Sequence, residues 1–369
     1  MIEQSKKYKI AIVAYNLDIG GLSKVILNLF SLLNKVTSIE TSLLLLDDKT
    51  ESKVFGGIVN FGDFTDRNSS FLNKINKYIK FKKYLKAQQF DFIIDMRYRL
   101  NPISEIFITK FLYPKAKIIY TVHSSKIETY LPKNTILTKW LYSKAYKIVC
   151  VAEANKKVVL KKHQLKNTTT IYNPIDFNDI NIKSNEVVSF NFEYILAVGR
   201  IVELKQFDKL INSYSNSILP SKKVKLVIVG DGPELEKIKN KVIDLNISDN
   251  VVFEGFSNNP YKYMKNARFF ILCSQYEGFG LVLAEALACG TPAISFDLVS
   301  GPSEIITHEF NGLLVENQNF EKLTKSIELL YRDEKLYTTC KSNAKSSVQK
   351  FSFEKITEEW LNLMQITIE

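Results

Sequence analysis

The sequence predicts an α/β protein with two domains, each built on a parallel β-sheet that helices cover on both faces. Three observations support this fold class. The 369 residues suggest about two domains. Hydrophobic residues make up 46% and charged residues 24% of the chain, which leaves enough apolar side chains for real cores. Short strand-like runs alternate with longer helical patterns, as they do in parallel sheets with helical crossovers.

The elements are expected in this alternating order along the chain. In the first half, a helix is expected over 22–35, among strand-like runs at 9–14, 41–46, 90–95, 117–121 and 147–151. In the second half, helices are expected over 205–216, 234–245 and 281–288, among strand-like runs at 194–198, 224–229, 251–254, 268–272 and 292–296. Helical patterns dominate from Phe320 to the end.

A break in the alternation divides the chain. The stretch Phe177–Glu193 is polar, rich in Asn and Ser, and without sustained periodicity, which indicates a linker. The last helical pattern, Phe353–Thr367, follows the second sheet and feeds no further strand. We therefore expect a first domain over 1–180, a second over 181–352, and a C-terminal helix in 353–369 that crosses back to the first domain.

The cysteine and histidine content excludes several classes of protein. The four cysteines have no C-x-x-C spacing and there are only three histidines, so neither a disulfide framework nor a zinc cluster is predicted. No segment approaches the roughly 18–20 apolar residues of a membrane span. The first apolar run, Ile10–Tyr15, suits a buried strand and is too short for a signal peptide. We expect a reduced, cytoplasmic protein.

The positive charge belongs to one half of the chain. Residues 1–185 hold 30 Lys and Arg against 15 Asp and Glu, a net charge of +15, whereas residues 186–369 hold 20 against 24, a net charge of −4. Nucleic acid and anionic lipid are both partners that such charge would attract. The densest segment, Phe71–Lys86, reads as a basic amphipathic helix. Its apolar positions are Leu72, Ile75, Tyr78, Ile79 and Leu85, with Lys74, Lys77, Lys80, Lys82, Lys83 and Lys86 between them. It fits a membrane interface, or a solvated helix whose apolar stripe packs on its own domain.

Several loops after predicted strands have residues that suit phosphate. Gly20-Gly21 follows the first strand and opens a helix, so backbone amides could approach an anion there. Gly199-Arg200 ends a strand and Lys205 follows five residues later, which gives two cations for a diphosphate. The turn Gly230–Glu234 is also rich in glycine, but a structural connection explains it better.

The strongest signal is the segment Glu277–Gly290. Its stretch Leu281–Cys289 is apolar on every side, which predicts a buried helix, and Glu285 is the only charge in it. A buried carboxylate needs a partner, such as a sugar or ribose hydroxyl or a basic side chain. If the segment were helical throughout, Glu277 and Glu285 would be about 12 Å apart, too far for the pair of a glycoside hydrolase.

At these residues the chain resembles the retaining GT-B glycosyltransferases of the glycosyltransferase 4, or glycosyl transferases group 1, family. The matching motifs extend from Gly20-Gly21, through His123 and Asn173–Asp176, to the Glu-x7-Glu pair Glu277 and Glu285. The resemblance implies two Rossmann-like domains facing each other across a cleft, and transfer of a sugar from a nucleotide.

The resemblance also implies roles for individual residues. Arg200 and Lys205 would neutralise the leaving diphosphate beside Gly199, and Glu277 and His123 would contact the donor sugar. The remaining donor-binding positions would be Gly20 and Gly21, Glu285 on the ribose, the amides of Phe279, Gly280 and Leu281 on the distal phosphate, and Phe256 near the base. No D-x-D or histidine cluster is present, so no metal and no further cofactor is expected.

Departures from the family pattern bear on the donor. Gln206 stands where a glycine is usual after Lys205, and Ser300-Gly301-Pro302 replaces the usual glycine pair near the sugar pocket. This form is similar to members that build bacterial surface glycans such as capsule, O-antigen or lipooligosaccharide, several of which use UDP-linked galacto-configured or N-acetylated sugars. We expect transfer of a hexose or N-acetylhexosamine from a UDP-sugar to a lipid-linked or growing glycan, on the inner face of the cytoplasmic membrane, with no nucleic-acid partner.

Two other functions remain open from the sequence. A nucleotide-sugar epimerase or hydrolase of the same fold would share the donor pocket but would not need a basic half. A polyanion-binding protein without catalysis would explain the charge, but it would give Glu285 and the phosphate loops no role.

Overall fold

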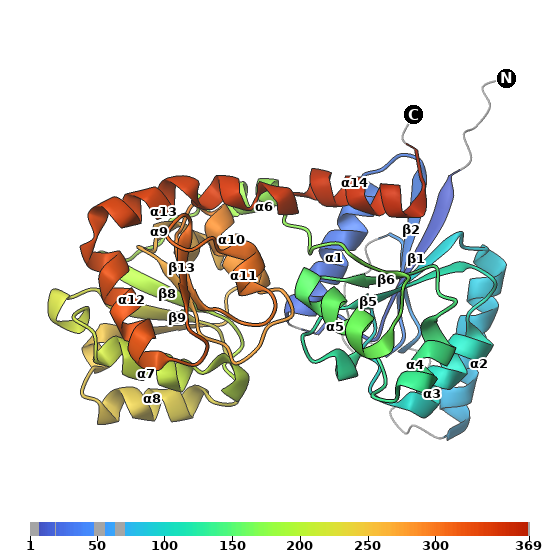
Figure 1. Ribbon diagram of the computed structural model, residues 1–369, viewed down its shortest axis with the longest axis horizontal. Coiled ribbons are helices and arrows are strands. Elements are labelled where there is room, and N and C mark those ends of the chain that lie inside the picture. The colour runs from blue at the N-terminus through green and yellow to red at the C-terminus, as the bar shows by residue number, and fades with distance from the viewer. Residues whose placement is uncertain (1–6, 19, 48–55, 63–70, 368–369) are drawn as a thin grey trace. The chain divides into compact units, whose positions relative to one another are not determined.

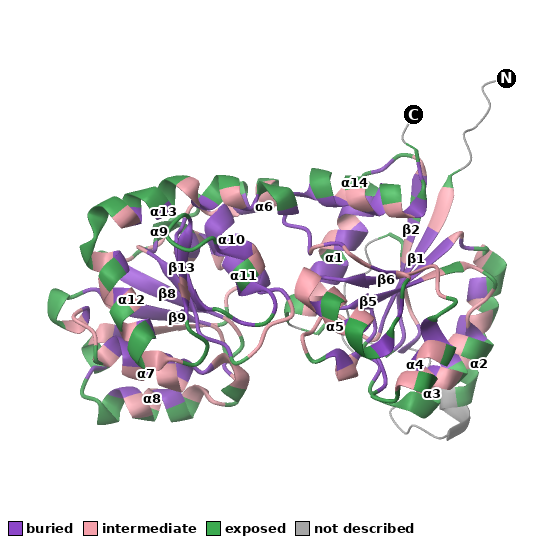
Figure 2. Cartoon of the chain, in the orientation of Figure 1, coloured by how far each residue is buried: buried purple, intermediate pink, exposed green. Residues whose placement is uncertain are grey.

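The computed structural model describes residues 7–18, 20–47, 56–62 and 71–367, without the side chains of residues 71–74. The chain forms two compact units, one of residues 1–174 with 353–369 and the other of residues 175–352. Within each unit one sheet lies between layers of helices (Figure 1). The central strands of each sheet are deeply buried, whereas edge strands such as β3 and β10 are less so (Figure 2). The predicted fold class of two parallel α/β sheets is confirmed.

The sheet of the first unit has seven strands in the order β3-β2-β1-β4-β5-β6-β7. Every pairing is parallel; Val13 of β1, for example, lies between Leu44 of β2 and Asp95 of β4. The carboxyl ends of these strands therefore meet at one edge. The strands are β1 Tyr8–Ala14, β2 Ile39–Leu45, β3 Ile58–Asn60, β4 Phe92–Asp95, β5 Lys117–Val122, β6 Lys147–Cys150 and β7 Thr168–Thr170.

The helices of the first unit include α14, which packs against α1 and accepts a hydrogen bond from Tyr146 Oη at the Leu363 carbonyl (2.9 Å). The helices are α1 Gly21–Asn34, α2 Phe71–Gln88, α3 Pro102–Phe107, α4 Thr135–Tyr142, α5 Glu153–His163 and α14 Phe353–Met364, with a π-helical turn η2 at Ile108–Leu112 and a 3₁₀ turn η3 at Ile127–Thr129.

Helix α2 departs from the amphipathic pattern that the sequence suggested. Its buried face holds Phe81 and Leu85, and Lys77, one turn before Phe81, is only 8% exposed. The Lys77 amine reaches Asp47, with Nζ 3.7 Å from Oδ1, so this lysine faces its own domain. Ile75 and Ile79, expected in the apolar stripe, are instead exposed. The side chains of Leu72 and Lys74 lie outside the described residues.

The sheet of the second unit has six parallel strands in the order β10-β9-β8-β11-β12-β13. The strands are β8 Tyr194–Val198, β9 Lys225–Val229, β10 Val251–Gly255, β11 Phe270–Leu272, β12 Ala293–Phe296 and β13 Gly312–Val315. The helices are α6 Phe177–Lys183, α7 Phe207–Ser215, α8 Leu235–Asp244, α9 Tyr261–Asn266, α10 Leu281–Ala288, α11 Pro302–Ile305, α12 Phe320–Arg332 and α13 Glu334–Ser347, with 3₁₀ turns η4 Glu203–Lys205, η5 Pro220–Lys222, η6 Ser248–Asn250 and η7 Gln349–Phe351.

The segment predicted as a linker begins with a helix. Asp176 caps α6 by accepting hydrogen bonds from the amides of Asn178 (3.1 Å) and Asp179 (3.0 Å). Only Ile180 of this seven-residue helix is buried, so its sequence has too few apolar positions to show a helical period. The sequence analysis also missed the edge strands β3 and β7. Each has three residues, which are too few for a recognisable alternation of apolar and polar side chains.

A buried network of four charges lies behind the carboxyl end of β4. Arg97 NH2 is 2.5 Å from Asp95 Oδ2 and 3.2 Å from Glu105 Oε2, and Arg99 NH1 is 3.5 Å from Asp95 Oδ1. Burial alone would raise the pKa of Asp95, but the charges of Arg97 and Arg99 outweigh it and hold that pKa below its usual range. Arg99 also donates to the carbonyls of Tyr130 (2.7 Å) and Thr121 (2.8 Å), and so ties three chain segments together.

We predict that Arg97→Met lowers the free energy of unfolding of the first unit by about 3–5 kcal/mol, because it leaves Asp95 and Glu105 buried without their common partner. Urea unfolding followed by circular dichroism measures this. The loss should shrink as the pH falls below about 4, since a carboxylate with a lowered pKa stabilises the fold only while ionised. Lys325→Met, at the exposed Glu321–Lys325 pair, is the control and should change stability by less than about 1 kcal/mol. An equal effect of both substitutions would contradict the prediction.

Candidate active site

The two predicted cations of the second unit lie on the loop that follows β8. Gly199 and Arg200 leave the strand, and Lys205 ends the 3₁₀ turn η4. Lys205 Nζ is 2.6 Å from Glu277 Oε1, which also accepts a hydrogen bond from Ser274 Oγ (2.7 Å). Arg200 is exposed and makes no ion pair with any residue that the structure describes. The structure thus brings Lys205 and Glu277 together and leaves Arg200 open to an anion.

The glycine-rich turn after β9 is built for close backbone packing. A Cβ atom on Gly230 would lie 1.9 Å from the Gly199 carbonyl oxygen, and one on Gly232 would lie 2.2 Å from that of Ile201. The amide of Ile201 also donates to the Asp231 carbonyl (2.8 Å). This turn therefore supports the loop that holds the two cations, as the structural explanation predicted.

Gln206 keeps the backbone conformation that glycine would adopt more readily. Its φ of 54° is left-handed, and its amide donates to the Glu203 carbonyl (3.0 Å) to close η4. A non-glycine residue in this region costs about 1 kcal/mol. The side chain of Gln206 is buried and hydrogen-bonds to Gln318 (2.9 Å), which helps to hold the unfavourable conformation.

Helix α10 is buried on every side, as predicted, but it begins only at Leu281. Gly280 has a φ of 91° and ends the loop that carries Glu277. The condition of a helix through Glu277 is therefore not met, because left-handed Gly280 precedes the first helical residue and the helix begins about one turn after Glu277. Glu277 lies beside the N-terminus of α10 and not on its face. Among the first amides of the helix, those of Leu283 and Ala284 donate to the Gly280 carbonyl (2.9 and 3.3 Å).

Glu285 lies within α10 and is 3% exposed. Tyr261 Oη donates to Glu285 Oε1 (3.2 Å). Burial and the nearby Glu285 carboxylate raise the pKa of Tyr261 far above its usual value, so this hydroxyl stays a donor at any physiological pH. Tyr261 could not be found from the sequence, because a tyrosine at the start of α9, 24 residues before Glu285, belongs to no motif. The lone buried carboxylate was predicted correctly, but one of its partners is a phenol and not a cation.

Two further loops complete this region of the second unit. A Cβ on Gly301 would lie 2.4 Å from the Phe279 carbonyl oxygen, and Ser300 Oγ donates to the Glu277 carbonyl (2.8 Å), so this loop holds the Glu277 loop in place. Phe279 is buried, with its ring 5.0 Å from that of Phe351. Phe256, which follows β10, is half exposed and free to stack on a flat ring.

His123, Gly20 and Gly21 belong to the first unit. His123 follows β5, and its Nε2 lies 2.8 Å from Thr121 Oγ1. Burial and the charge of Arg99 lower the pKa of His123 to about 3, so the ring is neutral at physiological pH. Thr121 Oγ1 in turn donates to the Asp95 carbonyl (3.1 Å), which can only accept. The hydroxyl must therefore accept from His123, and the histidine proton is on Nε2.

Gly20 and Gly21 stand at the N-terminus of α1, and nothing that the structure describes fills the space around them. A Cβ on either glycine would meet no atom within 4 Å, and the φ of Gly20, 162°, is extended backbone that any residue adopts. Neither packing nor conformation within the described chain requires glycine here. The open space suits a ligand that approaches the helix N-terminus.

Comparison with known proteins identifies the family. Residues 19–179 match the model for "Glycosyltransferase Family 4", and residues 179–347 match the model for "Glycosyl transferases group 1". The chain belongs to this glycosyltransferase family. A Campylobacter jejuni relative is 27% identical over 368 residues, which cover 96% of this chain and 99% of the relative. It is named N-acetylgalactosamine-N,N'-diacetylbacillosaminyl-diphospho-undecaprenol 4-alpha-N-acetylgalactosaminyltransferase.

Other relatives of this glycosyltransferase match over less sequence or in fold. The poly(ribitol-phosphate) alpha-N-acetylglucosaminyltransferase of Staphylococcus aureus is 31% identical over 230 residues, 61% of this chain and 45% of the relative. The crystal structure of Anabaena HepE with UDP-glucose has a TM-score of 0.79 at 19% identity and covers 97% of this chain and 100% of that chain. This likeness shows that the glycosyltransferase has the GT-B fold. Its relatives include an N-acetylgalactosaminyltransferase and an N-acetylglucosaminyltransferase.

We predict that His123 is a neutral Nε2–H tautomer from about pH 5 to pH 8 and does not titrate there, because its lowered pKa lies far below that range. Nitrogen chemical shifts of ¹⁵N-histidine-labelled protein measure this directly. Thr121→Val removes the acceptor and should weaken the preference for this tautomer, while Thr121→Ser, which keeps the hydroxyl, should preserve it. A dominant Nδ1–H tautomer in the wild type would refute the assignment.

Proposed function

We propose that this glycosyltransferase moves a hexose or N-acetylhexosamine from a UDP-sugar to a lipid-linked or growing bacterial surface glycan, with retention at the anomeric carbon. The observation that carries the proposal is the Lys205–Glu277 pair beside the N-terminus of buried helix α10. This arrangement supplies a cation and helix amides for a diphosphate and a carboxylate for sugar hydroxyls. The names of the Campylobacter and Staphylococcus relatives support an N-acetylated sugar.

In this proposal, protein charges stabilise the departing diphosphate. Lys205 keeps one of its three N–H donors on Glu277 and has others for a phosphate oxygen, while exposed Arg200 supplies a bidentate fork. The amides of Phe279, Gly280 and Leu281 face the distal phosphate. Because these groups are held by packed loops before the donor binds, they need little reorganisation as charge develops on the leaving group.

The carboxylates and the histidine would orient the rest of the donor. Glu277 accepts hydrogen bonds from the sugar hydroxyls, and Glu285 accepts from the ribose while Tyr261 occupies part of its capacity. In this proposal the neutral His123 contacts the donor sugar. Gly20, Gly21 and Gly199 let the backbone approach the donor, and Phe256 lies against the base.

The chemical step that we propose keeps the acceptor on the same face as the leaving group. The bond from the anomeric carbon to the diphosphate oxygen breaks, and a bond from that carbon to the acceptor oxygen forms on the same side. The acceptor proton passes to the departing phosphate oxygen, so the protein supplies no nucleophile and atoms and charge balance. Arg200 and Lys205 stabilise the charge that the diphosphate gains.

We further propose that the acceptor is at the inner face of the cytoplasmic membrane. The Campylobacter relative is named for a diphospho-undecaprenol substrate, and the first half of this chain carries a net charge of +15. Among the described residues no helix is long and apolar enough to cross a membrane. A peripheral attachment through basic groups fits both facts.

A nucleotide-sugar epimerase or hydrolase and a polyanion-binding protein are the competing functions. Incubation with UDP-N-acetylgalactosamine, UDP-N-acetylglucosamine, UDP-galactose and UDP-glucose, with and without a polyprenyl-diphosphate glycan, separates the three. A transferase releases UDP and lengthens the glycan only when the acceptor is present. UDP release or sugar epimerisation that is indifferent to acceptor, or no turnover at all, would refute the proposed transfer.

We predict that Arg200→Ala and Lys205→Ala each lower kcat by about 10²–10³ at saturating donor, because each removes a preorganised cation from the leaving group. Steady-state UDP release measures kcat, and circular dichroism checks the fold. The control is Lys237→Ala, which removes an exposed lysine of α8 and should leave kcat unchanged. Wild-type kcat in both variants would remove the diphosphate role of this loop.

We also predict transfer without added divalent metal, since Arg200, Lys205 and the N-terminus of α10 are the charge compensation that the proposal uses. Protein treated with excess EDTA and then desalted should keep its rate. The contrary outcome is loss of transfer in EDTA and recovery with Mg²⁺ or Mn²⁺.

A further inference from the structure

The first unit exposes apolar side chains in sets whose members are one helical turn apart, on three neighbouring helices. They are Ile75 and Ile79 on α2, Ile103, Phe107 and Phe111 on α3 and η2, and Ile136 and Trp140 on α4; we call these seven residues the apolar ridge. A spacing of four residues places the members of each set on one helix face. Their exposure is large: 79% for Ile103, 59% for Phe111, 81% for Ile136 and 53% for Trp140.

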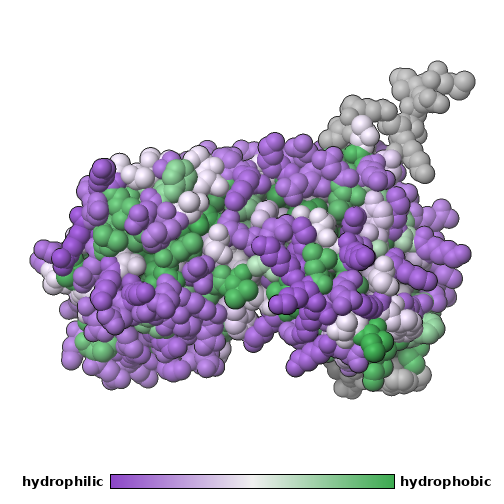
Figure 3. All heavy atoms as spheres, viewed as in Figure 1, coloured by the Kyte–Doolittle hydropathy of each residue, from purple (hydrophilic) through white to green (hydrophobic). Residues whose placement is uncertain are grey.

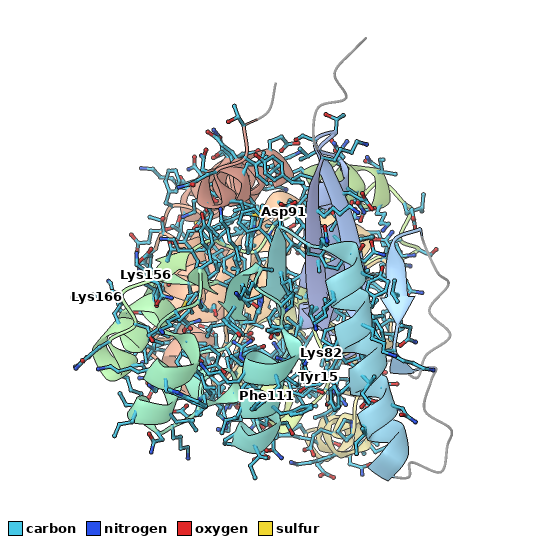
Figure 4. All side chains as sticks on the ribbon, turned by 90° about the vertical axis from the view of Figure 1, so that its right-hand side faces the viewer. Tyr15, Lys82, Asp91, Phe111, Lys156 and Lys166 are labelled. Carbon is cyan, nitrogen blue, oxygen red and sulfur yellow. The ribbon has the colours of Figure 1, made fainter. Side chains whose placement is uncertain are left out.

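Side-chain contacts join the three helices into one surface. The ring of Tyr78 on α2 lies 5.8 Å from that of Phe107, and the Phe107 and Phe111 rings are 6.1 Å apart. Lys110 of η2 donates to the Trp140 carbonyl of α4 (2.8 Å), with its Nζ 4.5 Å from the centre of the indole ring. In Figure 4, Lys82 is labelled on α2, and Phe111 is labelled on the neighbouring element η2. Figure 3 shows hydrophobic surface where Figure 1 draws α3 and α4.

The exposed charges on the helices that carry the apolar ridge are all positive. Across α2, α3, η2 and α4 the sequence holds a single acidic residue, Glu105, and that residue is buried. Lysines surround the ridge, with Lys80 and Lys83 on α2, Lys110 on η2, and Lys139 and Lys144 in or just after α4. Burial and the nearby charge of Lys144 lower the pKa of Lys110, in keeping with a positive local potential.

An apolar surface ringed by cations matches one kind of partner. Anionic lipid supplies negative headgroups for the lysines and an acyl region for the isoleucine and phenylalanine side chains. Tryptophan favours the boundary between the two, and lysine stems can lie along apolar surface while their amines stay at the headgroups. A protein partner would need acidic residues around an apolar centre, whereas every anionic bilayer has this layering.

We propose that the apolar ridge inserts into the headgroup region of an anionic bilayer and anchors the first unit there. This inference rests on the proposed function in one respect: membrane binding would bring the enzyme to a lipid-linked acceptor. In this proposal the main contact with the bilayer is made by the exposed apolar side chains of α3, η2 and α4. The lysines of α2, of which Lys77 is buried, make a smaller contribution. Attachment then has an apolar component that salt does not screen.

The sequence provides a natural probe for the test. The chain has two tryptophans, Trp140 in the ridge and Trp360, which is buried in α14. The variant Trp360→Phe leaves Trp140 as the only indole. With vesicles of phosphatidylcholine and phosphatidylglycerol we expect its emission to shift to shorter wavelength and to be quenched by brominated acyl chains. Part of the binding should survive about 0.5 M NaCl, where surface charges are strongly screened.

A matched pair of double variants tests the residues without changing net charge. Ile103→Ser with Phe111→Ser removes two ridge side chains and should weaken vesicle partitioning about tenfold or more. Ile182→Ser with Ile243→Ser removes two equally exposed side chains of the second unit and should change it by less than about twofold. UDP-sugar turnover in detergent solution should be the same in both double variants as in the wild type.

The outcomes that overturn the inference are distinct from failure of the proposed function. Vesicle binding without bromolipid quenching of Trp140 would mean adsorption by charge alone. Shielding of Trp140 from iodide before vesicles are added would mean that the chain itself or a second copy covers the ridge, and light scattering separates those two cases. Sugar transfer by a protein that does not bind vesicles would refute the anchoring alone, whereas vesicle binding without UDP-sugar turnover would refute the proposed function alone.

Discussion

Parallel strand pairing is the constraint on which the arrangement of each unit depends. Because all strands of a sheet run the same way, the loops that follow them gather at one edge. In the second unit these loops touch through backbone, and Gly230 and Gly301 stand where a Cβ atom would collide with a neighbouring carbonyl. The loops with Lys205 and Glu277 are thereby held together before any ligand is bound.

The two units use charge in different ways. In the first unit the charged groups are buried and hydrogen-bond to each other and to backbone carbonyls; they are Asp95, Arg97 and Arg99. That network reaches His123 through Thr121 and determines which ring nitrogen carries the proton. In the second, Arg200 is exposed and Lys205 is partly so. Buried charges fix geometry in the first unit, whereas the cations on the loop after β8 stay accessible in the second.

The first unit also exposes apolar side chains, and those on α2 were not all placed correctly from the sequence. The sequence pattern of α2 placed Lys77 among the lysines between the apolar positions and Ile75 in the apolar stripe, and it left open whether that stripe meets lipid or its own domain; in the structure Lys77 is buried and Ile75 is exposed. The buried face of α2 holds Phe81 and Leu85, and Lys77 on the same face reaches Asp47. Tyr78 of α2 meets Phe107 of α3, and Lys110 of η2 meets Trp140 of α4, although these elements are distant in sequence.

The sequence by itself determined the alternation of strands and helices, the buried helix after Gly280 and the motif residues Arg200, Lys205, Glu277 and Glu285, because each follows from local residue order. Only the tertiary structure decided which side chains meet: Tyr261 with Glu285, Lys205 with Glu277, and Thr121 with His123 and the Asp95 carbonyl. Most of these partners are 24 or more residues apart. Their contact depends on loop packing and strand register, which no local pattern of residues encodes.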